Sequence, residues 1–201
     1  MVENARGIPH DSHIPVFRDS DHVRCAMNEK PKTDLAAIEM LVLDVDGVLT
    51  DGRIITHKDG SESKCFHVLD GHGIRMWQRA GLKIAWLSGR DSVATSRRAE
   101  ELQVPYVLQD CHEKLPALQK LLAEVGVPVQ NVAYVGDDVM DLPVMRQVGL
   151  GVAVANAVDE VKERADYVTT RAGGAGAVRE VIEYILKGSG RWQSLMERYH
   201  A

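Results

Sequence analysis

The stretch Met40-Leu-Val-Leu-Asp-Val-Asp-Gly-Val-Leu-Thr50 carries the strongest fold signal in the chain. Its first part, 40–45, is a short apolar run with β-branched residues, which is typical of a strand buried on both faces of a sheet. Similar runs recur further along the chain, at 82–87, 104–108, 132–135 and 150–154. Each of these runs predicts a buried strand.

Helical patterns separate the apolar runs. They lie at 73–79, 92–102, 113–125, 139–148 and 158–165. A chain that alternates strands and helices in this way forms βαβ units, with parallel strands and helices on both faces of the sheet. We therefore expect an α/β domain with a parallel sheet.

One segment, 52–68, interrupts this alternation. Two short runs flank Asp59-Gly60, a pair typical of a tight hairpin turn because it supplies residues with positive φ. The segment follows the first predicted strand and lies near the C-terminal ends of the strands, where open α/β sheets bind ligands. We expect a β-hairpin beside the binding site.

The composition limits the possible classes of protein. The chain has 201 residues, 45% of them apolar, and a formal net charge of −5, which argues against broad attraction to nucleic acid or an anionic membrane. No apolar run approaches the roughly 20 residues that span a bilayer, and no signal-peptide pattern opens the chain. Cys25, Cys65 and Cys111 are widely spaced and predict neither a disulfide framework nor a zinc site. We expect a cytoplasmic protein without nucleic-acid or membrane partners.

The two ends of the chain differ from its middle. Residues 1–36 are polar and lack a period, which predicts a flexible leader, and its histidines have no metal-binding spacing. A single domain is expected at 37–188 and a tail at 189–201. Gly188 and Gly190 are hinge-like. Beyond them, residues 191–199 either reach into the active site of a neighbouring subunit or form a frayed terminal helix.

Acidic residues follow two of the predicted strands. Asp44 and Asp46 come after the first, and Asp137 and Asp138 follow the fourth. Residues two apart in a strand point the same way, and neighbouring parallel strands end at one edge of the sheet. Such negative charge at a buried rim requires a cation, and oxygen ligands without Cys or His favour Mg²⁺ over zinc. The alternative, that these residues only cap the next helices, explains one cluster well and two poorly.

Groups suited to phosphate follow two further strands. Ser88 and Arg90 lie after the 82–87 run, where a hydroxyl and turn amides bind phosphate oxygens readily. Lys114 lies at the next strand-to-helix junction, where its ammonium would neutralise both a nucleophile and a phosphoryl group. Because each of these features follows a predicted strand, together they predict a site for phosphoryl transfer.

These motifs resemble those of the haloacid dehalogenase superfamily over roughly 36–187, on the residues Asp44-Val-Asp46-Gly-Val-Leu-Thr, Ser88, Lys114 and Gly136-Asp137-Asp138. The resemblance implies a Rossmann-like three-layer sandwich with Asp44 as nucleophile. It implies a metal site formed by Asp44, Asp137 and the backbone carbonyl of Asp46. Asp46 would also act as general acid and base, and Ser88 and Lys114 would complete the catalytic set.

The chain between the first two motifs has room only for the hairpin and one helix, so no cap domain is expected. An uncapped site is open to water, whereas excluding water strengthens electrostatic catalysis. Such a protein must act on a large substrate or be covered by a neighbouring subunit.

Three stretches, 46–53, 66–75 and 173–180, resemble more narrowly the family of 3-deoxy-D-manno-octulosonate 8-phosphate phosphatases of lipopolysaccharide sugar biosynthesis. The resemblance implies a capless homotetramer that hydrolyses this phosphorylated sugar acid through an aspartyl-phosphate, with Mg²⁺ as cofactor. The substrate contacts carried over are Asp46, His67, Val68, Leu69, Asp70, Gly71, Arg75, Arg90, Arg98 and Lys114. Several arginines suit a ligand that bears both a phosphate and a carboxylate.

The sequence departs from this family at His67, where members usually carry Asn, and at Asp110, where they carry Gly. Leu87-Ser88 also replaces the more usual Ile-Thr, a change that keeps the hydroxyl. Arg98 alternatively decorates a solvated helix face. Arg75 favours the eight-carbon acid, and a phosphatase of nine-carbon nonulosonate 9-phosphates is the alternative within the same class. A non-catalytic protein that binds Mg²⁺ and phosphate is the alternative outside it. Asp46 separates the two classes, because only turnover needs a group that protonates the leaving oxygen.

Overall fold

The computed structural model describes residues 33–199. Its centre is a sheet of six parallel strands in the order β5-β4-β1-β6-β7-β8. The strands are β1 (Met40–Leu43), β4 (Lys83–Leu87), β5 (Tyr106–Leu108), β6 (Val132–Gly136), β7 (Leu150–Ala153) and β8 (Tyr167–Val168). Every residue of β1, β6 and β7 is buried, as the continuous apolar runs predict.

The register of the three central strands decides where the site lies. Leu43, the last residue of β1, pairs with Trp86 of β4 on one side and with Val135 of β6 on the other. The three strands therefore end at nearly the same level, and the residues that follow them emerge at one edge of the sheet.

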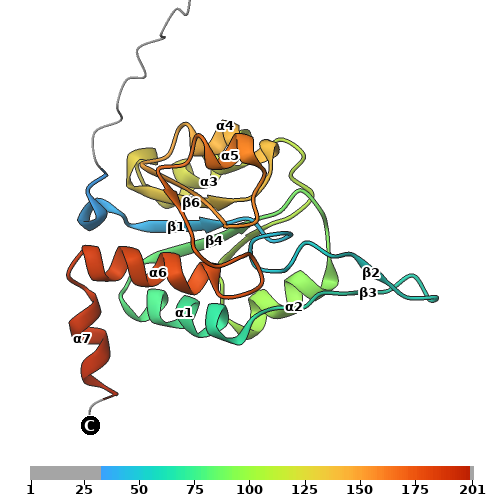
Figure 1. The fold of residues 1–201 in the computed structure, drawn as a ribbon, viewed down its shortest axis with the longest axis horizontal. Coiled ribbons are helices and arrows are strands. Elements are labelled where there is room, and N and C mark those ends of the chain that lie inside the picture. The colour runs from blue at the N-terminus through green and yellow to red at the C-terminus, as the bar shows by residue number, and fades with distance from the viewer. Residues whose placement is uncertain (1–32, 200–201) are drawn as a thin grey trace, which may run out of the picture. The chain divides into compact units, whose positions relative to one another are not determined.

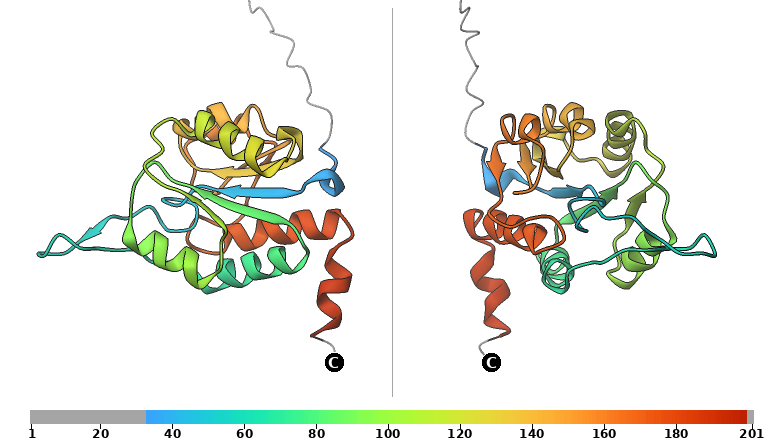
Figure 2. Two further views of the ribbon diagram at one scale, coloured as in Figure 1. Left: turned by 180° about the vertical axis from the view of Figure 1, so that it is seen from behind. Right: turned by 45° about the vertical axis from the view of Figure 1, so that its right-hand side comes forward.

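Helices cover both faces of this sheet (Figure 1). On one face lie α1 (Val68–Arg79), α2 (Val93–Glu101) and α6 (Ala177–Gly188), and on the other α3 (Lys114–Val125), α4 (Leu142–Met145) and α5 (Asp159–Lys162), an arrangement that Figure 2 shows from two further sides. The largest fully buried side chains are Trp77, Trp86 and Tyr134. The expected three-layer α/β sandwich is thus confirmed.

The insertion after β1 is the predicted hairpin, and it extends away from the sheet (Figure 1). Its strands β2 (Ile55–Thr56) and β3 (Glu62–Ser63) pair antiparallel. Gly60 has φ of +82°, but Asp59 does not share the left-handed conformation, so the prediction of positive φ at both residues was wrong. The Asp59 carboxylate instead accepts hydrogen bonds from the backbone N–H and hydroxyl of Ser61, at 3.0 and 2.6 Å.

Several helix bounds differ from the predicted ones. α1 begins at Val68 rather than residue 73, since His67 caps it by accepting the N–H of Leu69 at 3.2 Å. The pattern at 139–148 forms the 3₁₀ turn η3 (Val139–Asp141) and the short α4, and α5 is likewise short. β8 and α6 were not predicted, whereas the helix α7 (Trp192–Glu197) corresponds to the terminal helix that was one of the two alternatives for residues 191–199.

The structure describes the predicted C-terminal tail more fully than the predicted N-terminal leader. Most of the predicted leader lies outside the described residues, but the hydroxyl of Thr33 donates to the carbonyl of Gly149 at 2.7 Å, and Asp34 caps the 3₁₀ turn η1 (Leu35–Ala37). A further 3₁₀ turn, η2 (Val129–Asn131), precedes β6. At the other end, the Tyr199 hydroxyl lies 3.0 Å from Arg79 Nη1 and 3.1 Å from His72 Nε2, so the described tail packs on its own α1. Among residues 33–199, none of the helices combines the length and the hydropathy that a membrane span requires.

Candidate active site

Asp44 lies just beyond β1, buried between the ends of β6 and α3. Its backbone N–H continues the sheet by donating to the Val135 carbonyl at 3.0 Å. Its carboxylate forms an ion pair with Lys114 Nζ at 3.0 Å. Burial, reinforced by the nearby Asp141 carboxylate, raises the pKa of Asp44 to about 6 even though Lys114 opposes the shift.

Asp141 anchors this arrangement from η3. One of its oxygens accepts hydrogen bonds from Lys114 Nζ and the Tyr134 hydroxyl, each at 2.6 Å. The other accepts the backbone N–H groups of Asp137 at 2.9 Å and Asp138 at 3.2 Å. An ionised carboxylate has about four acceptor positions, so these contacts use the capacity of Asp141. Asp141 therefore positions Lys114 and the loop after β6.

The Asp137 carboxylate, which lies near that of Asp44, packs against Gly47 at a position where only glycine fits. Gly47 has φ of +91°, and a Cβ at that position would lie 2.0 Å from Asp137 Oδ2. A Cβ on Gly173 would in turn lie 1.7 Å from the Gly47 carbonyl oxygen. Burial and the Asp44 carboxylate raise the pKa of Asp137 to about 8. The loops after β1, β6 and β8 are therefore closely packed. The backbone of Gly47 lies against the Asp137 carboxylate on one side and against Gly173 on the other.

We call Asp44, Lys114, Asp137 and Asp141 the inner cluster. Oxygen atoms of its three carboxylates all lie within 4.8 Å of one another. One ammonium, that of Lys114, faces them, so the fully ionised cluster has an excess of two negative charges. An all-oxygen donor set fits Mg²⁺, and Asp44 and Asp137 have oxygens to offer, whereas those of Asp141 are engaged.

A second group of charges, which we call the outer cluster, consists of Asp46, Glu62, Lys64 and Arg90. Lys64 Nζ contacts Asp46 Oδ1 and lies 3.6 Å from Glu62. Arg90 contacts Glu62 through Nη2 and lies 3.6 Å from Asp46 Oδ2 through Nη1. The cluster joins the turn after β1, the hairpin and the loop after β4, and its two anions match its two cations.

Ser88, which follows β4, is buried beneath the same edge of the sheet. Its hydroxyl donates to the Arg90 carbonyl at 3.0 Å and accepts the Arg90 N–H at 3.2 Å. Its carbonyl accepts the N–H of Cys111 at 3.0 Å, which ties this loop to the one that precedes α3. The predicted residues Asp44, Asp46, Ser88 and Arg90 therefore lie on loops at one edge of the sheet, and Lys114 begins α3 at the same edge.

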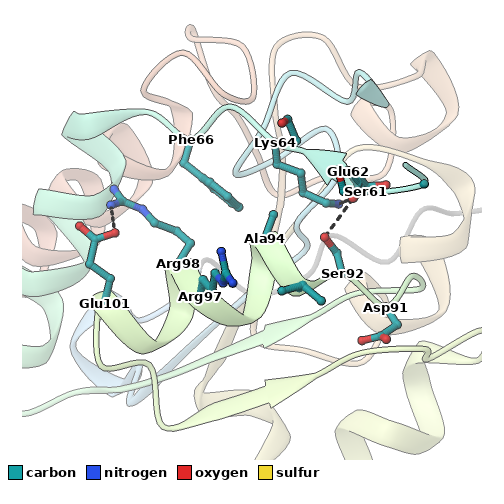
Figure 3. A pocket seen from close by; sticks show the side chains of 13 residues that line it. Ser61, Glu62, Lys64, Phe66, Asp91, Ser92, Ala94, Arg97, Arg98 and Glu101 are labelled. Carbon is teal, nitrogen blue, oxygen red and sulfur yellow. Dashed lines mark hydrogen bonds and ion pairs between the residues drawn. The ribbon is translucent and has the colours of Figure 1, made fainter. Parts of the chain in front are cut away.

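An open cavity of ≈ 770 Å³ lies between the hairpin and α2 (Figure 3). Glu62 and Lys64 of the outer cluster form part of its wall. Arg98 also lines it, bound to Glu101 at 2.7 Å and stacked over the Phe66 ring at 6.0 Å. Arg98 thus faces a cavity next to the outer cluster instead of open solvent.

The other predicted substrate residues lie on α1 or, as His67 does, cap it. Val68 and Leu69 are exposed on the first turn of α1, and Gly71 packs against the Arg98 guanidinium. Asp70 is buried and accepts the Arg179 N–H of α6 at 2.8 Å. The Arg75 guanidinium is bound to Gln78, Gln103 and the Leu102 carbonyl, at 3.0, 2.8 and 3.0 Å.

Sequence reasoning missed four residues of the two clusters or their supports. Asp141 stood in the acidic run after the fourth strand, and its spacing three residues after Asp138 signals a capping box, which the structure contains. Tyr134 lay inside a strand pattern, where nothing distinguishes it from a core residue. Glu62 and Lys64 lay in the hairpin, where no motif marks them.

The fold and the inner cluster define a class of protein, the haloacid dehalogenase-like hydrolases, and the family model of that description matches residues 106–182. A relative from Escherichia coli (strain K12), the 3-deoxy-D-manno-octulosonate 8-phosphate phosphatase KdsC, is 46% identical over 154 residues, 77% of this chain and 82% of that protein. The corresponding protein of Yersinia pestis is 44% identical over 75% of this chain and 81% of its own length.

A solved structure of 3-deoxy-D-manno-octulosonate 8-phosphate phosphatase from Moraxella catarrhalis, in complex with magnesium, phosphate and a KDO molecule, is also similar. It is 38% identical, its TM-score is 0.81, and the match covers 83% of this chain and 95% of that one. The chain belongs to the family of 3-deoxy-D-manno-octulosonate 8-phosphate phosphatases.

Proposed function

We propose that this protein is a Mg²⁺-dependent phosphoric monoester hydrolase that converts 3-deoxy-D-manno-octulosonate 8-phosphate to 3-deoxy-D-manno-octulosonate and phosphate. One observation carries the proposal: the buried Asp44 carboxylate, 3.0 Å from Lys114 Nζ, shares an all-oxygen cluster with Asp137. A buried carboxylate beside an ammonium and a second carboxylate suits nucleophilic attack in phosphoryl transfer. The family relationship names the substrate.

In the first step, an oxygen of Asp44 attacks the phosphorus of the substrate. The P–O bond to the sugar breaks as the bond to Asp44 forms, and Asp46 gives a proton to the departing sugar oxygen. Lys114 neutralises charge on both the nucleophile and the phosphoryl group. Asp44 and Asp137, together with the backbone carbonyl of Asp46, would hold Mg²⁺, which supplies positive charge against the repulsion between carboxylate and phosphate.

In the second step, Asp46 accepts a proton from a water molecule that attacks the aspartyl-phosphate. Phosphate leaves, and Asp44 is regenerated as a free carboxylate. Asp46 ends each cycle in the protonation state in which it began, since it gives one proton and takes one back. Ser88 and Arg90, on the loop after β4, are proposed to hold the phosphoryl oxygens.

The sugar acid itself is proposed to lie in the cavity beside the outer cluster. Arg98 lines that cavity and suits the substrate carboxylate. Arg75 lies beside the first residues of β4 and β5, away from the edge where the strands end, and Val68 and Leu69 are exposed. We therefore propose that they serve a neighbouring subunit of a cytoplasmic homotetramer, in which the missing cap is replaced by the adjacent copy. Sedimentation analysis tests the oligomer.

The test of the function is hydrolysis of a matched pair of substrates. Release of phosphate from the eight-carbon 8-phosphate is expected to require Mg²⁺, to stop with a chelator and to exceed that from a nine-carbon nonulosonate 9-phosphate. A preference for the nine-carbon acid would instead identify the protein as a nonulosonate 9-phosphate phosphatase. Binding of Mg²⁺ and phosphate without turnover on either sugar would assign a regulatory protein.

A further inference from the structure

The side chain of Lys64 is only 1% exposed, although the residue directly follows β3. The hairpin that contains β3 extends from the sheet (Figure 1). A lysine is rarely buried so fully unless it is paired. Its ammonium contacts Asp46 Oδ1 and lies 3.6 Å from Glu62 Oε1, so two carboxylates compensate its desolvation. Lys64 is thus committed to Asp46 and is not a solvated surface charge.

Glu62 is itself held in place from the opposite side. Its carboxylate contacts Arg90 Nη2 and accepts the Ser92 hydroxyl at 2.9 Å, as Figure 3 shows for Ser92. Both of these partners lie between β4 and α2. Lys64 is therefore braced against the body of the domain through Glu62.

The chain on either side of Lys64 is also anchored. Before it, Thr56 and Glu62 pair across the hairpin. After it, the ring of Phe66 stacks on Trp86 of β4 with centroids 6.2 Å apart. Because both flanks are fixed, the Lys64 ammonium has a defined place above the turn that carries Asp46.

The two oxygens of Asp46 differ in their surroundings. Oδ1 is bound by Lys64, whereas Oδ2 is buried and has no hydrogen-bond partner among residues 33–199. Arg90 Nη1 lies 3.6 Å from Oδ2, beyond hydrogen-bond distance. One oxygen is thus held by Lys64, while the other has no hydrogen bond that would compete for a proton.

We infer that Lys64 is a positioning residue that orients the Asp46 carboxylate for catalysis, which makes the hairpin part of the catalytic machinery. The inference rests on the proposed function. The donating oxygen of a general acid must lie within about 2.6–3.2 Å of the leaving oxygen that receives the proton. A misplacement of about 1 Å can lower the rate about 100-fold. Because Lys64 holds Oδ1, the Asp46 side chain cannot rotate freely, and Oδ2 keeps its position relative to the leaving oxygen of the substrate.

The test is a double-mutant cycle between Lys64→Met and Asp46→Asn, assayed on the eight-carbon sugar phosphate. Lys64→Met alone is expected to lower kcat about 10- to 100-fold with less than about a threefold change in KM. In the Asp46→Asn background it is expected to lower kcat less than about twofold further, because Lys64 acts through Asp46. An equal loss in both backgrounds would overturn the inference.

The leaving group gives a second, independent readout. p-Nitrophenolate departs without a proton, so its first-turnover burst from p-nitrophenyl phosphate is expected to keep its rate in Lys64→Met. A burst slowed as much as turnover on the sugar phosphate would instead indicate general damage to the site. Lys58→Met, the same change at an exposed position of the hairpin, is the matched control and should leave both rates unchanged.

Two outcomes keep the inference separate from the proposed function. If the unaltered protein releases no phosphate from either sugar, the proposed function fails first. If it does so and Lys64→Met is as active, only the role of Lys64 fails. Should Lys64→Met not fold, Lys64→Gln, whose amide can still donate to Asp46, is expected to retain more activity than Lys64→Ala, and equal activities would refute the role.

Discussion

The inner and outer clusters lie at the same edge of the sheet and differ in their charge balance. The inner cluster sets three carboxylates against one ammonium, whereas the outer cluster sets two carboxylates against a lysine and an arginine. The inner cluster therefore needs a further cation to balance its charge, whereas the charges of the outer cluster already balance. In the proposed mechanism, the carboxylates that bind the metal lack a balancing cation, whereas the carboxylate that moves the proton has one.

The two clusters also differ in how they are held. Inner-cluster residues follow strands β1 and β6 or begin α3, so the sheet and helix fix their positions. The outer cluster includes Glu62 and Lys64 of the hairpin, which is joined to the domain by ion pairs and by the stacking of Phe66 on Trp86. We expect changes in the inner cluster to affect stability and activity together, and changes in the outer cluster to affect mainly activity.

The largest effect is expected for Asp44→Asn, which removes the proposed nucleophile. Turnover should fall about 10⁴-fold or more, measured as phosphate release from the eight-carbon sugar phosphate. The melting temperature of the metal-free protein should rise, because the substitution removes one of the repelling carboxylates. A lower melting temperature would contradict the view that the inner cluster is over-charged.

Asp141→Asn is expected to have the next largest effect. It weakens the buried contacts to Lys114 and Tyr134 and turns an amide N–H toward the backbone donors of the loop after β6. The free energy of unfolding should fall by about 3 kcal/mol, as for other broken buried pairs, measured by urea titration. Glu62→Gln, in the less buried outer cluster, is the comparison and should cost about 1 kcal/mol or less.

Gly47→Ala should lower stability by about 2 kcal/mol, through a strained φ of +91° and a Cβ placed 2.0 Å from Asp137 Oδ2. Because Asp137 must move, Mg²⁺ affinity is expected to fall as well, as measured by calorimetry. Gly60→Ala in the hairpin is the matched control. It has a similar φ of +82° but nothing within 4 Å, so it should show the strain alone and bind Mg²⁺ normally.

The smallest expected effect is a dependence of Mg²⁺ stabilisation on pH. The pKa values of Asp44 and Asp137 are raised to about 6 and about 8, so the stability that they contribute is complete below their ordinary value of 3.8. It is lost as the pH rises through about 6 and then about 8, where Mg²⁺ binds the ionised forms.

The rise in melting temperature on adding Mg²⁺ should therefore be larger at about pH 8.5 than at about pH 5.5. Asp137→Asn should remove most of this difference. An equal rise at both pH values would show that the carboxylates of the inner cluster are ionised throughout, and would remove the contrast between the two clusters.

The sequence by itself determined the parallel α/β sheet and the placement of Asp44, Asp137 and Lys114 at strand ends. Hydrophobic runs and the residues directly after them are local features, and parallel strands must end at one edge. It also determined the hairpin, since the Asp59-Gly60 pair is a local turn signal, although only Gly60 takes the left-handed conformation.

Only the tertiary structure decided which charges meet. Lys64 contacts Asp46 across 18 residues of chain, and Lys114 contacts Asp141 across 27, distances at which no spacing rule operates. It also decided that Arg75 lies beside the first residues of β4 and β5, Lys83 and Tyr106, and not at the edge where the strands end. The physical reason is that charge pairing depends on how the hairpin and loops pack on the sheet, and that packing brings together residues that no local pattern connects.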